Sequence, residues 1–226
     1  MKYLLLLSMI ILAVTSFSQS KVLSDFPAKS NSIESFIPEG YDTITVVKGD
    51  LNNDKVADIV MVLRHEYEKT EDPGNVDPDT IPSRILVVLF RKGKIFELAA
   101  ASGAAIMCRN CGGIFGDPFE EVAVEKGILV IRHYGGSAWR WGNTHKFRFQ
   151  KNAFFLIGQT TISYWNVEMC NRLGEFAATE YEDINFLTGG YIKKKISQEG
   201  CKLLVNKKGK NPVKPLVKLE DFSTEN

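Results

Sequence analysis

Short apolar runs alternate with turn residues along most of the chain. The runs are rich in β-branched and aromatic residues, and separations of two to five residues are typical of antiparallel hairpins. Four hairpins are expected, with turns at 92–94, 125–127, 151–153 and 189–190. The runs TITVV and ADIVMVLRH flank a polar loop, and CKLLVNKK is expected to add a last strand. The pattern predicts an all-β fold of antiparallel meander sheets, similar to the blades of a β-propeller.

One segment lacks this alternation, EMCNRLGEFAATEYED at 168–183. It is expected to hold one short helix. No stretch of the chain carries the long apolar stripe of an amphipathic helix. The fold class is therefore predicted as all-β with at most one or two short helices.

The first twenty residues, MKYLLLLSMIILAVTSFSQS, read as a secretory signal peptide. A single cation, Lys2, precedes an apolar run, and Ser16 and Ser18 fit the small-residue positions before a cleavage site. The run is too short to span a bilayer, and no cysteine follows the cut to carry a lipid. The prediction is a secreted or periplasmic protein with no transmembrane segment after signal cleavage.

Four segments are predicted from this organisation. They are a signal peptide at 1–18, a flexible lead-in at 19–35, a single β domain at 36–205 and a Lys-rich tail at 206–226. With 44% hydrophobic and 24% charged residues the chain is expected to fold. Its 28 Lys and Arg nearly balance its 27 Asp and Glu, which argues against a nucleic-acid partner.

The loop GDLNNDKVADIV has the spacing of a calcium site. Asp50, Asn52 and Asp54 occupy its first, third and fifth positions, the backbone carbonyl of Val56 the seventh, and Asp58 the ninth. Calcium takes six to eight oxygen ligands, which alternate side chains of a short loop can supply. The spacing resembles the calcium loops of FG-GAP and VCBS-type repeats, and a structural calcium ion is predicted here.

Lys55 is the objection to this calcium site. Calcium loops usually have glycine at that sixth position, where φ is often positive, and a lysine also brings a positive charge. The alternative is a turn rich in Asp and Asn that holds no ion. Either way the loop is expected to stiffen the fold rather than to carry out catalysis.

Four cysteines favour disulfides in a secreted chain, namely Cys108, Cys111, Cys170 and Cys201. A local bridge within CRNC would leave Cys170 and Cys201 as the second pair. Free thiols, a zinc site and a redox motif remain as alternatives. Zinc is disfavoured because only one CxxC pair is present, and redox activity because glycines rather than a helix follow Cys111.

The stretch RHYGGSAWRWGNTHKFR, at 132–148, is the candidate ligand-binding hairpin. In an extended chain Trp139 and Trp141 face one side and Arg140 the other, with His133 nearby. Exposed tryptophans beside a histidine can stack on a sugar ring or grip a partner protein. The alternative is that both tryptophans cap the core while Arg140 lies over an aromatic ring.

Several blocks occur together in a recognisable order: FIPEGY, KGDLNNDKVADIVMVL, ILVVLF, CRNCGGIFGDPFE, HYGGSAWRWG and DINFLTG. As a set, between about residues 36 and 189, they resemble a family of secreted or periplasmic bacterial proteins with a single FG-GAP/VCBS-like calcium loop. The resemblance implies no activity and supplies no catalytic residues.

Three functions are compatible with these features. The first is a non-enzymatic β-domain that calcium stabilises and that binds a protein or glycan of the cell envelope. The second is a glycosidase-like envelope hydrolase using carboxylates such as Asp117 and Glu120 with His133 or His145. The third is a purely structural envelope protein. Phosphate-binding glycine loops, HExxH and G-x-S-x-G are missing from the sequence, and this favours binding over catalysis.

Overall fold

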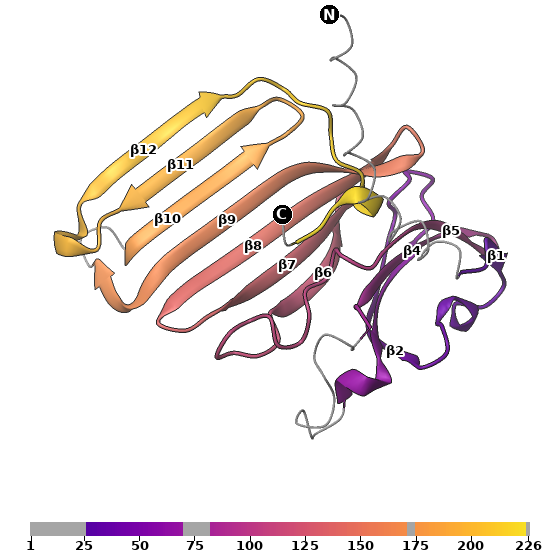
Figure 1. Ribbon diagram of the computed structural model, residues 1–226. Coiled ribbons are helices and arrows are strands. Elements are labelled where there is room, and N and C mark those ends of the chain that lie inside the picture. The colour runs from indigo at the N-terminus through magenta and orange to yellow at the C-terminus, as the bar shows by residue number, and fades with distance from the viewer. Residues whose placement is uncertain (1–25, 70–81, 171–174, 225–226) are drawn as a thin grey trace, which may run out of the picture.

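The computed structural model describes residues 26–69, 82–170 and 175–224, which fold into two antiparallel sheets (Figure 1). A five-stranded sheet has the order β1-β5-β4-β3-β2, and a seven-stranded sheet has the order β12-β11-β10-β9-β8-β7-β6. The strands of the first sheet are β1 (Lys29–Ser30), β2 (Tyr41–Gly49), β3 (Asp58–His65), β4 (Ile85–Lys92) and β5 (Ile95–Ser102). From β2 to β12 each strand pairs with a strand next to it in the chain, so the predicted antiparallel meander is confirmed.

The seven-stranded sheet holds the longest strands of the described chain. Its strands are β6 (Phe119–Glu125), β7 (Ile128–Gly136), β8 (Trp139–Gln150), β9 (Ala153–Cys170), β10 (Glu175–Asn185), β11 (Gly190–Ile196) and β12 (Leu203–Lys210). Short 3-10 helices lie between or after the strands at η1 (Glu34–Phe36), η2 (Glu66–Lys69), η4 (Glu199–Cys201) and η5 (Leu219–Asp221). In the described part of the chain no helix is long and apolar enough to cross a membrane.

The predicted hairpins all form, as β4–β5, β6–β7, β8–β9 and β10–β11. In the turn between β6 and β7, Lys126 and Gly127 have φ angles of 52° and 77°. Lys151 and Asn152 adopt the same conformation between β8 and β9, with φ angles of 50° and 60°. Two successive residues with positive φ characterise the type I′ turn, whose twist matches that of the paired strands.

The short helix expected at 168–183 is not formed in the described residues. Residues 168–170 end β9 and residues 175–183 belong to β10, whereas 171–174 lie outside the described residues. The pairing of β9 with β10 shifts register between Phe176 and Glu180, and Ala178 there has a φ of 50°. Such a bulge breaks the alternation of inward and outward side chains, which is why the sequence shows no strand pattern.

The main core lies between the two sheets. Alternate residues of the seven-stranded sheet point into it, and Leu129, Ile131 and Phe147 are completely buried there. The five-stranded sheet contributes Val60 and Val88 from the opposite side. This is the period-two alternation on which the strand prediction depended.

The run ADIVMVL is apolar at every position because both faces of β3 are buried. Val60 and Val62 face the main core, whereas Ile59 and Leu63 belong to a second cluster on the opposite face of the sheet. The segment around η1 covers that second face with the completely buried Phe36. A strand buried on both sides needs no polar face, and its sequence is therefore a continuous apolar run.

The β domain extends beyond both predicted boundaries. In the segment predicted as a flexible lead-in, β1 pairs with β5 and Phe26 is buried, while 19–25 lie outside the described residues. In the segment predicted as a Lys-rich tail, β12 continues to Lys210, and Leu219 and Phe222 are buried. Isolated apolar residues in polar segments create no periodicity, so the hydrophobic pattern does not reveal them. The predicted signal peptide at 1–18 also lies outside the described residues.

A segment around η5 closes one side of the main core. The backbone N–H of Leu156 in β9 donates to the carbonyl of Val217 over 2.9 Å. The ring of Phe222 lies 4.7 Å from that of His145 in β8. The N–H of Thr224 then donates to the carbonyl of Ala104, after β5, over 3.1 Å. The segment therefore contacts both sheets.

Half of the seven-stranded sheet projects away from the five-stranded sheet, as Figure 1 shows. This open half consists of β10–β12 with residues 139–143 of β8 and 159–170 of β9. We call the face of this sheet that packs on the main core the inner face, and the opposite one the outer face. In the open half the inner face carries tryptophans near its β8 side and polar residues over β9 to β11.

Candidate functional site

A shallow groove lies on the inner face of the open half. Its volume is about 400 Å³, and residues from β8 to β12 line it. The lining residues of the inward rows alternate along the strands with Ile162, Tyr181 and Lys194, which also line the groove. Cross-strand pairing arranges the inward side chains in two rows that run across the strands.

The first row is entirely polar. Asn143 of β8 is paired with Thr161 of β9, Thr161 with Glu182 of β10, and Glu182 with Lys193 of β11. The Lys193 ammonium contacts the Glu182 carboxylate at 2.7 Å. The hydrogen bond to Glu182 raises the pKa of Lys193, so this lysine stays charged at neutral pH.

The second row is polar in the middle and apolar at its ends. Trp141 of β8 is paired with Ser163, Ser163 with Glu180, Glu180 with Lys195, and Lys195 with Val205 of β12. Lys195 and Glu180 form an ion pair, so the charges of this row also balance. The groove thus offers hydroxyl, amide, carboxylate and ammonium groups between two apolar ends.

All three tryptophans of the chain lie on this inner face. Trp139 is paired with Trp165, their ring centroids are 5.3 Å apart, and Trp139 is 46% exposed. Trp141 lies two residues further along β8 and lines the groove. The prediction that Trp139 and Trp141 share one side of the strand is therefore confirmed.

Arg140 points to the outer face, away from the groove, as the alternation predicts. Its guanidinium lies over the ring of Phe115, 3.6 Å from the centroid. Tyr164 is its partner on β9, and the hydroxyls of Tyr164 and Tyr134 are 3.0 Å apart. The predicted ligand-binding set is thus divided between two faces of the sheet, and Arg140 takes the cation–π position of the alternative interpretation.

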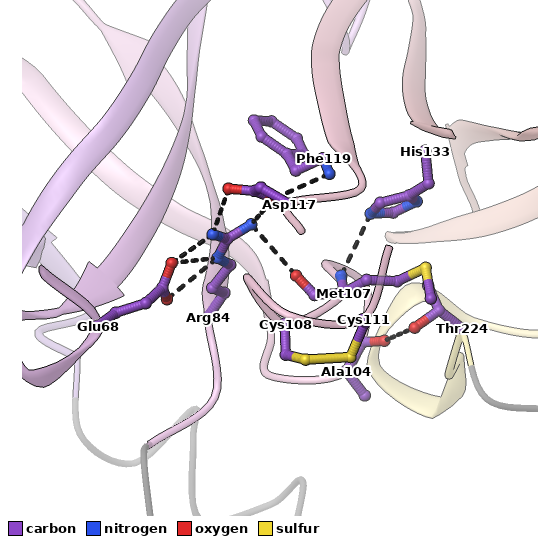
Figure 2. Close-up of a disulfide and its surroundings, with 10 residues drawn as sticks. All are labelled: Glu68, Arg84, Ala104, Met107, Cys108, Cys111, Asp117, Phe119, His133 and Thr224. Carbon is purple, nitrogen blue, oxygen red and sulfur yellow. Dashed lines mark hydrogen bonds and ion pairs between the residues drawn. A yellow bond between two sulfur atoms is a disulfide. The ribbon is translucent and has the colours of Figure 1, made fainter. Parts of the chain in front are cut away.

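His133, also predicted to bind a ligand, lies on the inner face but is only 1% exposed. Its Nε2 accepts a hydrogen bond from the backbone N–H of Met107 over 3.2 Å (Figure 2). His145, the other histidine considered for catalysis, is 5% exposed. Burial lowers the pKa of both histidines to about 4, so both are neutral at physiological pH. The structure places them in the core rather than in the groove.

A buried arginine joins three segments of the chain near His133. Arg84 contacts the carboxylates of Glu68 and Asp117, and its Nη1 donates to the carbonyl of Met107 over 3.3 Å (Figure 2). Arg84 is 2% exposed and Glu68 6%. The cluster therefore ties η2, the start of β4 and the CRNC loop together.

Asp117 is not available as the acid of a hydrolase. Its two oxygens accept hydrogen bonds from Arg84 over 2.8 and 2.6 Å. Burial alone would raise the pKa of Asp117, but the Arg84 hydrogen bonds outweigh it and hold this pKa below its usual range. A general acid needs a raised pKa instead. Glu120, the other proposed carboxylate, is exposed at the beginning of β6.

Hydrogen bonds of the loop itself occupy the predicted calcium ligands. Asp50 accepts from the N–H groups of Asn53 and Lys55, over 2.7 and 2.9 Å. Asp54 accepts from Val56 over 2.8 Å. In the described residues no group of three or more His, Cys, Asp or Glu side chains is arranged to hold a metal ion. The geometry is that of consecutive Asx turns, and calcium stays a prediction of the sequence.

Asp58 closes this loop from inside the fold. It is completely buried, and its two oxygens accept from the N–H groups of Leu51 and Arg91 over 2.8 and 3.1 Å. Burial raises the pKa of Asp58, and the charges of Asp54 and Asp50 raise it further. Lys55 has a φ of 69°, so the sixth position does adopt the conformation that favours glycine.

Thermal unfolding in excess calcium and in chelator tests the calcium prediction. A bound ion stabilises the folded state by mass action, so calcium should raise the midpoint of unfolding. Asp54→Ala should then abolish the difference, whereas Asp42→Ala, a carboxylate outside the loop, should retain it. Coincident curves for the unmodified chain would show that hydrogen bonds alone hold the loop.

Both predicted disulfides form. Cys108 is bonded to Cys111 and Cys170 to Cys201, with Cα–Cα distances of 5.2 and 5.4 Å. Neither free thiols nor a zinc site remain among the four cysteines. The second bridge joins the end of β9 to η4 and so connects two parts of the open half. Two disulfides are compatible with a secreted or periplasmic protein.

The ligand-binding site predicted from the sequence did not include the groove residues of β10 and β11. Glu180 and Glu182 on β10 face Lys195 and Lys193 on β11 across the turn at Gly189. The signal lies in the acidic residues of EYEDIN and the lysines of YIKKKIS, which face one another when the hairpin is folded at that turn. The bulge at Ala178 breaks the alternation of side chains in β10. The sequence of this strand therefore lacks the usual strand pattern, and its charged residues were not assigned to a hairpin.

No protein-family model matches the chain, and no curated protein or solved structure is significantly similar to it. The geometry of the groove and its surroundings is therefore the basis for the function proposed below.

Proposed function

We propose that the chain is a binding module that holds a glycan in the groove of the open half. The observation that carries this proposal is the position of Trp141 at one end of a groove whose middle is lined by hydrogen-bonding side chains. The buried histidines and the Arg84-bound Asp117 support recognition rather than hydrolysis.

The chemistry of the groove suits a sugar. A pyranose ring has an apolar C–H face and a rim of hydroxyls that both donate and accept hydrogen bonds. An indole ring packs against such a face because it offers a large and rigid apolar surface. The hydroxyls of Thr161 and Ser163 and the amide of Asn143 serve the rim. The groove volume of about 400 Å³ lies within the range of small-ligand sites.

The proposed setting is the outside of the cell or the periplasm. The two disulfides support an oxidising compartment, and the sequence at 1–18 has the features of a signal peptide. A glycan of the cell envelope would be within reach there.

A protein partner is the second candidate, and a specific surface favours it. Beyond the groove, the end of β9 exposes Val167 and Met169, which are 69% and 56% exposed, close to the Trp139–Trp165 pair. Exposed apolar residues gathered on one surface often mark protein interfaces. This surface adjoins the groove but does not include Trp141.

Binding to a glycan array, followed by titration calorimetry with the best ligand, tests the proposal. Trp141→Ala should weaken glycan binding at least about tenfold, since an aromatic anchor contributes more than about 1.4 kcal/mol. Trp139→Ala is the matched control and should change the affinity little, because this indole lies outside the groove lining. An empty array, or equal effects of the two substitutions, would contradict the proposal.

A further inference from the structure

We infer that the groove takes an uncharged, unbranched oligosaccharide of about four hexose units, which lies across the strands. This inference rests on the proposed glycan function and adds the length, direction and charge of the ligand. It follows from three properties of the groove, namely its extent across the sheet, its width along the strands and its balance of charge.

The length follows from the number of strands. Lining residues come from five adjacent strands, β8 to β12, which leaves four spacings between the first strand and the last. Strands lie about 4.8 Å apart, so the groove extends over roughly 19 Å. At one hexose unit per strand spacing, the groove therefore accommodates about four units.

The width follows from the two rows. On each strand the inward side chains are two residues apart, for example Trp141 and Asn143 on β8. Two residues of a strand span about 6.7 Å, which is the width of a single pyranose ring. A branched glycan would need more room than one ring, and the groove thus favours a single chain.

The charge balance excludes a ligand with its own charge. Three lysines line the groove, and the two whose side chains belong to the inward rows are each paired with a carboxylate on the neighbouring strand, Lys193 with Glu182 and Lys195 with Glu180. Lys194 lies between them on β11, opposite Tyr181, and by the alternation of the strand its side chain belongs to the outer face. An anionic sugar would have to displace a carboxylate, and a cationic sugar a lysine. A carboxylate has about four acceptor positions and an ammonium has three donors, so an ion pair leaves some of them unused. A neutral polyol can form hydrogen bonds with these remaining positions. Lys207 follows Lys193 in the first row but is not part of the groove lining.

The two ends of the second row fix how the chain lies. Trp141 and Val205 are apolar and stand at opposite ends of that row. Between them the middle units meet Ser163 and Glu180, which bind hydroxyls. The C–H faces of the terminal sugars are thus placed against apolar side chains, and the hydroxyls of the inner sugars against polar ones.

Calorimetric titration with oligosaccharides of graded length tests the inference. Three series are compared, namely neutral β-linked glucose oligomers, uronic acid oligomers and glucosamine oligomers. Affinity should rise with length in the neutral series and level off at about four units, where the ligand fills the groove. Between about 50 and about 500 mM salt the affinity should change less than twofold, because no net charge is neutralised.

Two substitutions separate the ion pairs of the groove from those elsewhere. Glu182→Gln removes an acceptor and unpairs Lys193, so neutral oligomers should bind several-fold more weakly and uronic acid oligomers more tightly. Glu121→Gln is the matched control, because Glu121 pairs with Arg132 on β6 and β7, outside the groove, and it should change neither affinity. Circular dichroism would confirm that both variants fold.

The remaining outcomes are distinguishable. Binding of charged oligomers alone, with a steep salt dependence, would overturn this inference and leave the glycan function standing. A neutral series that levels off at one or two units would overturn the proposed length. Failure of all three series, combined with an empty glycan array, would overturn the glycan function itself.

Discussion

Arg84→Met should lower the free energy of unfolding by about 3–5 kcal/mol, as is typical when one partner of a buried ion pair is removed. The substitution leaves the Glu68 carboxylate, whose side chain is 5% exposed, without its cation. It also takes two hydrogen bonds from Asp117 and one from the carbonyl of Met107. Urea unfolding monitored by tryptophan fluorescence measures the loss.

Arg132→Met is the control for this prediction, because Arg132 also pairs with two carboxylates. Its partners Glu121 and Glu125 are about half exposed, with side-chain exposures of 53% and 50%. Water solvates these carboxylates after the substitution, so the expected loss is below about 1 kcal/mol. Equal losses for the two arginines would show that burial of Glu68 is not what makes the Arg84 cluster costly to break.

Acidification should destabilise the fold through the two core histidines. Burial lowers the pKa of His133 and of His145 to about 4 in the folded chain, whereas an unfolded histidine has a pKa of about 6.5. Above that value both states are neutral and the histidines have no effect. Between about 6.5 and 4 only the unfolded chain takes up protons, so stability falls as the pH falls. Each histidine accounts for roughly 3 kcal/mol over this window.

Seven carboxyl groups with shifted pKa values modify this dependence. Burial raises the pKa of Asp58 and of Glu220, and their proton uptake in the folded state stabilises the chain as the pH falls. The pKa values of Asp117 and Asp42 are lowered instead by their Arg and Lys partners, which outweigh burial. Hydrogen bonds also lower the pKa values of three exposed carboxyl groups, Glu34, Glu97 and Glu125, so all five groups add to the loss in acid. The five lowered groups take effect as the pH falls through their unfolded pKa values, at and below about 4.5, so the histidines should dominate the slope between about pH 6.5 and 4.5.

Urea unfolding at about pH 7.5 and about pH 4.5 measures this effect. The double variant His133→Gln and His145→Gln should lose most of the difference between the two pH values, even if its stability at neutral pH is lower. His65→Gln is the control, since His65 is only partly buried at the end of β3, and it should keep the full difference. A double variant with an unchanged pH dependence would assign the acid sensitivity to the carboxyl groups.

Periodicity predicts most of this fold because local turns determine which strands pair. Lys126 and Gly127 bend the chain so that β6 meets β7, and the alternation of Leu129 and Ile131 then decides which face is buried. The same reasoning fails at Ala178, where a bulge breaks the alternation. It also fails for Phe26 and Phe222, which are buried by contacts distant in sequence and have no pattern around them.

Only the part of the site that lies on a single strand, β8, could be predicted from the sequence. Alternation along β8 correctly placed Trp139 and Trp141 on one face and Arg140 on the other. The alternation did not reveal that His133 is buried. Burial depends on which other segments pack against that face of the sheet, and the sequence of the strand does not specify them. The partners of Trp141 on β10 and β11 depend on register across three strands, which a single segment does not encode.

The segment around η5 also has a consequence for how the protein is made. Leu219 and Phe222 complete the core between sheets whose strands all precede residue 211. On a ribosome or in a translocation channel, the nascent chain therefore emerges with every strand before its core is closed. Until residue 222 is free, the apolar surface around His145 and Phe147 stays uncovered on that side. Emergence of residues 219–222, rather than pairing of the strands, should be the event that completes the native fold.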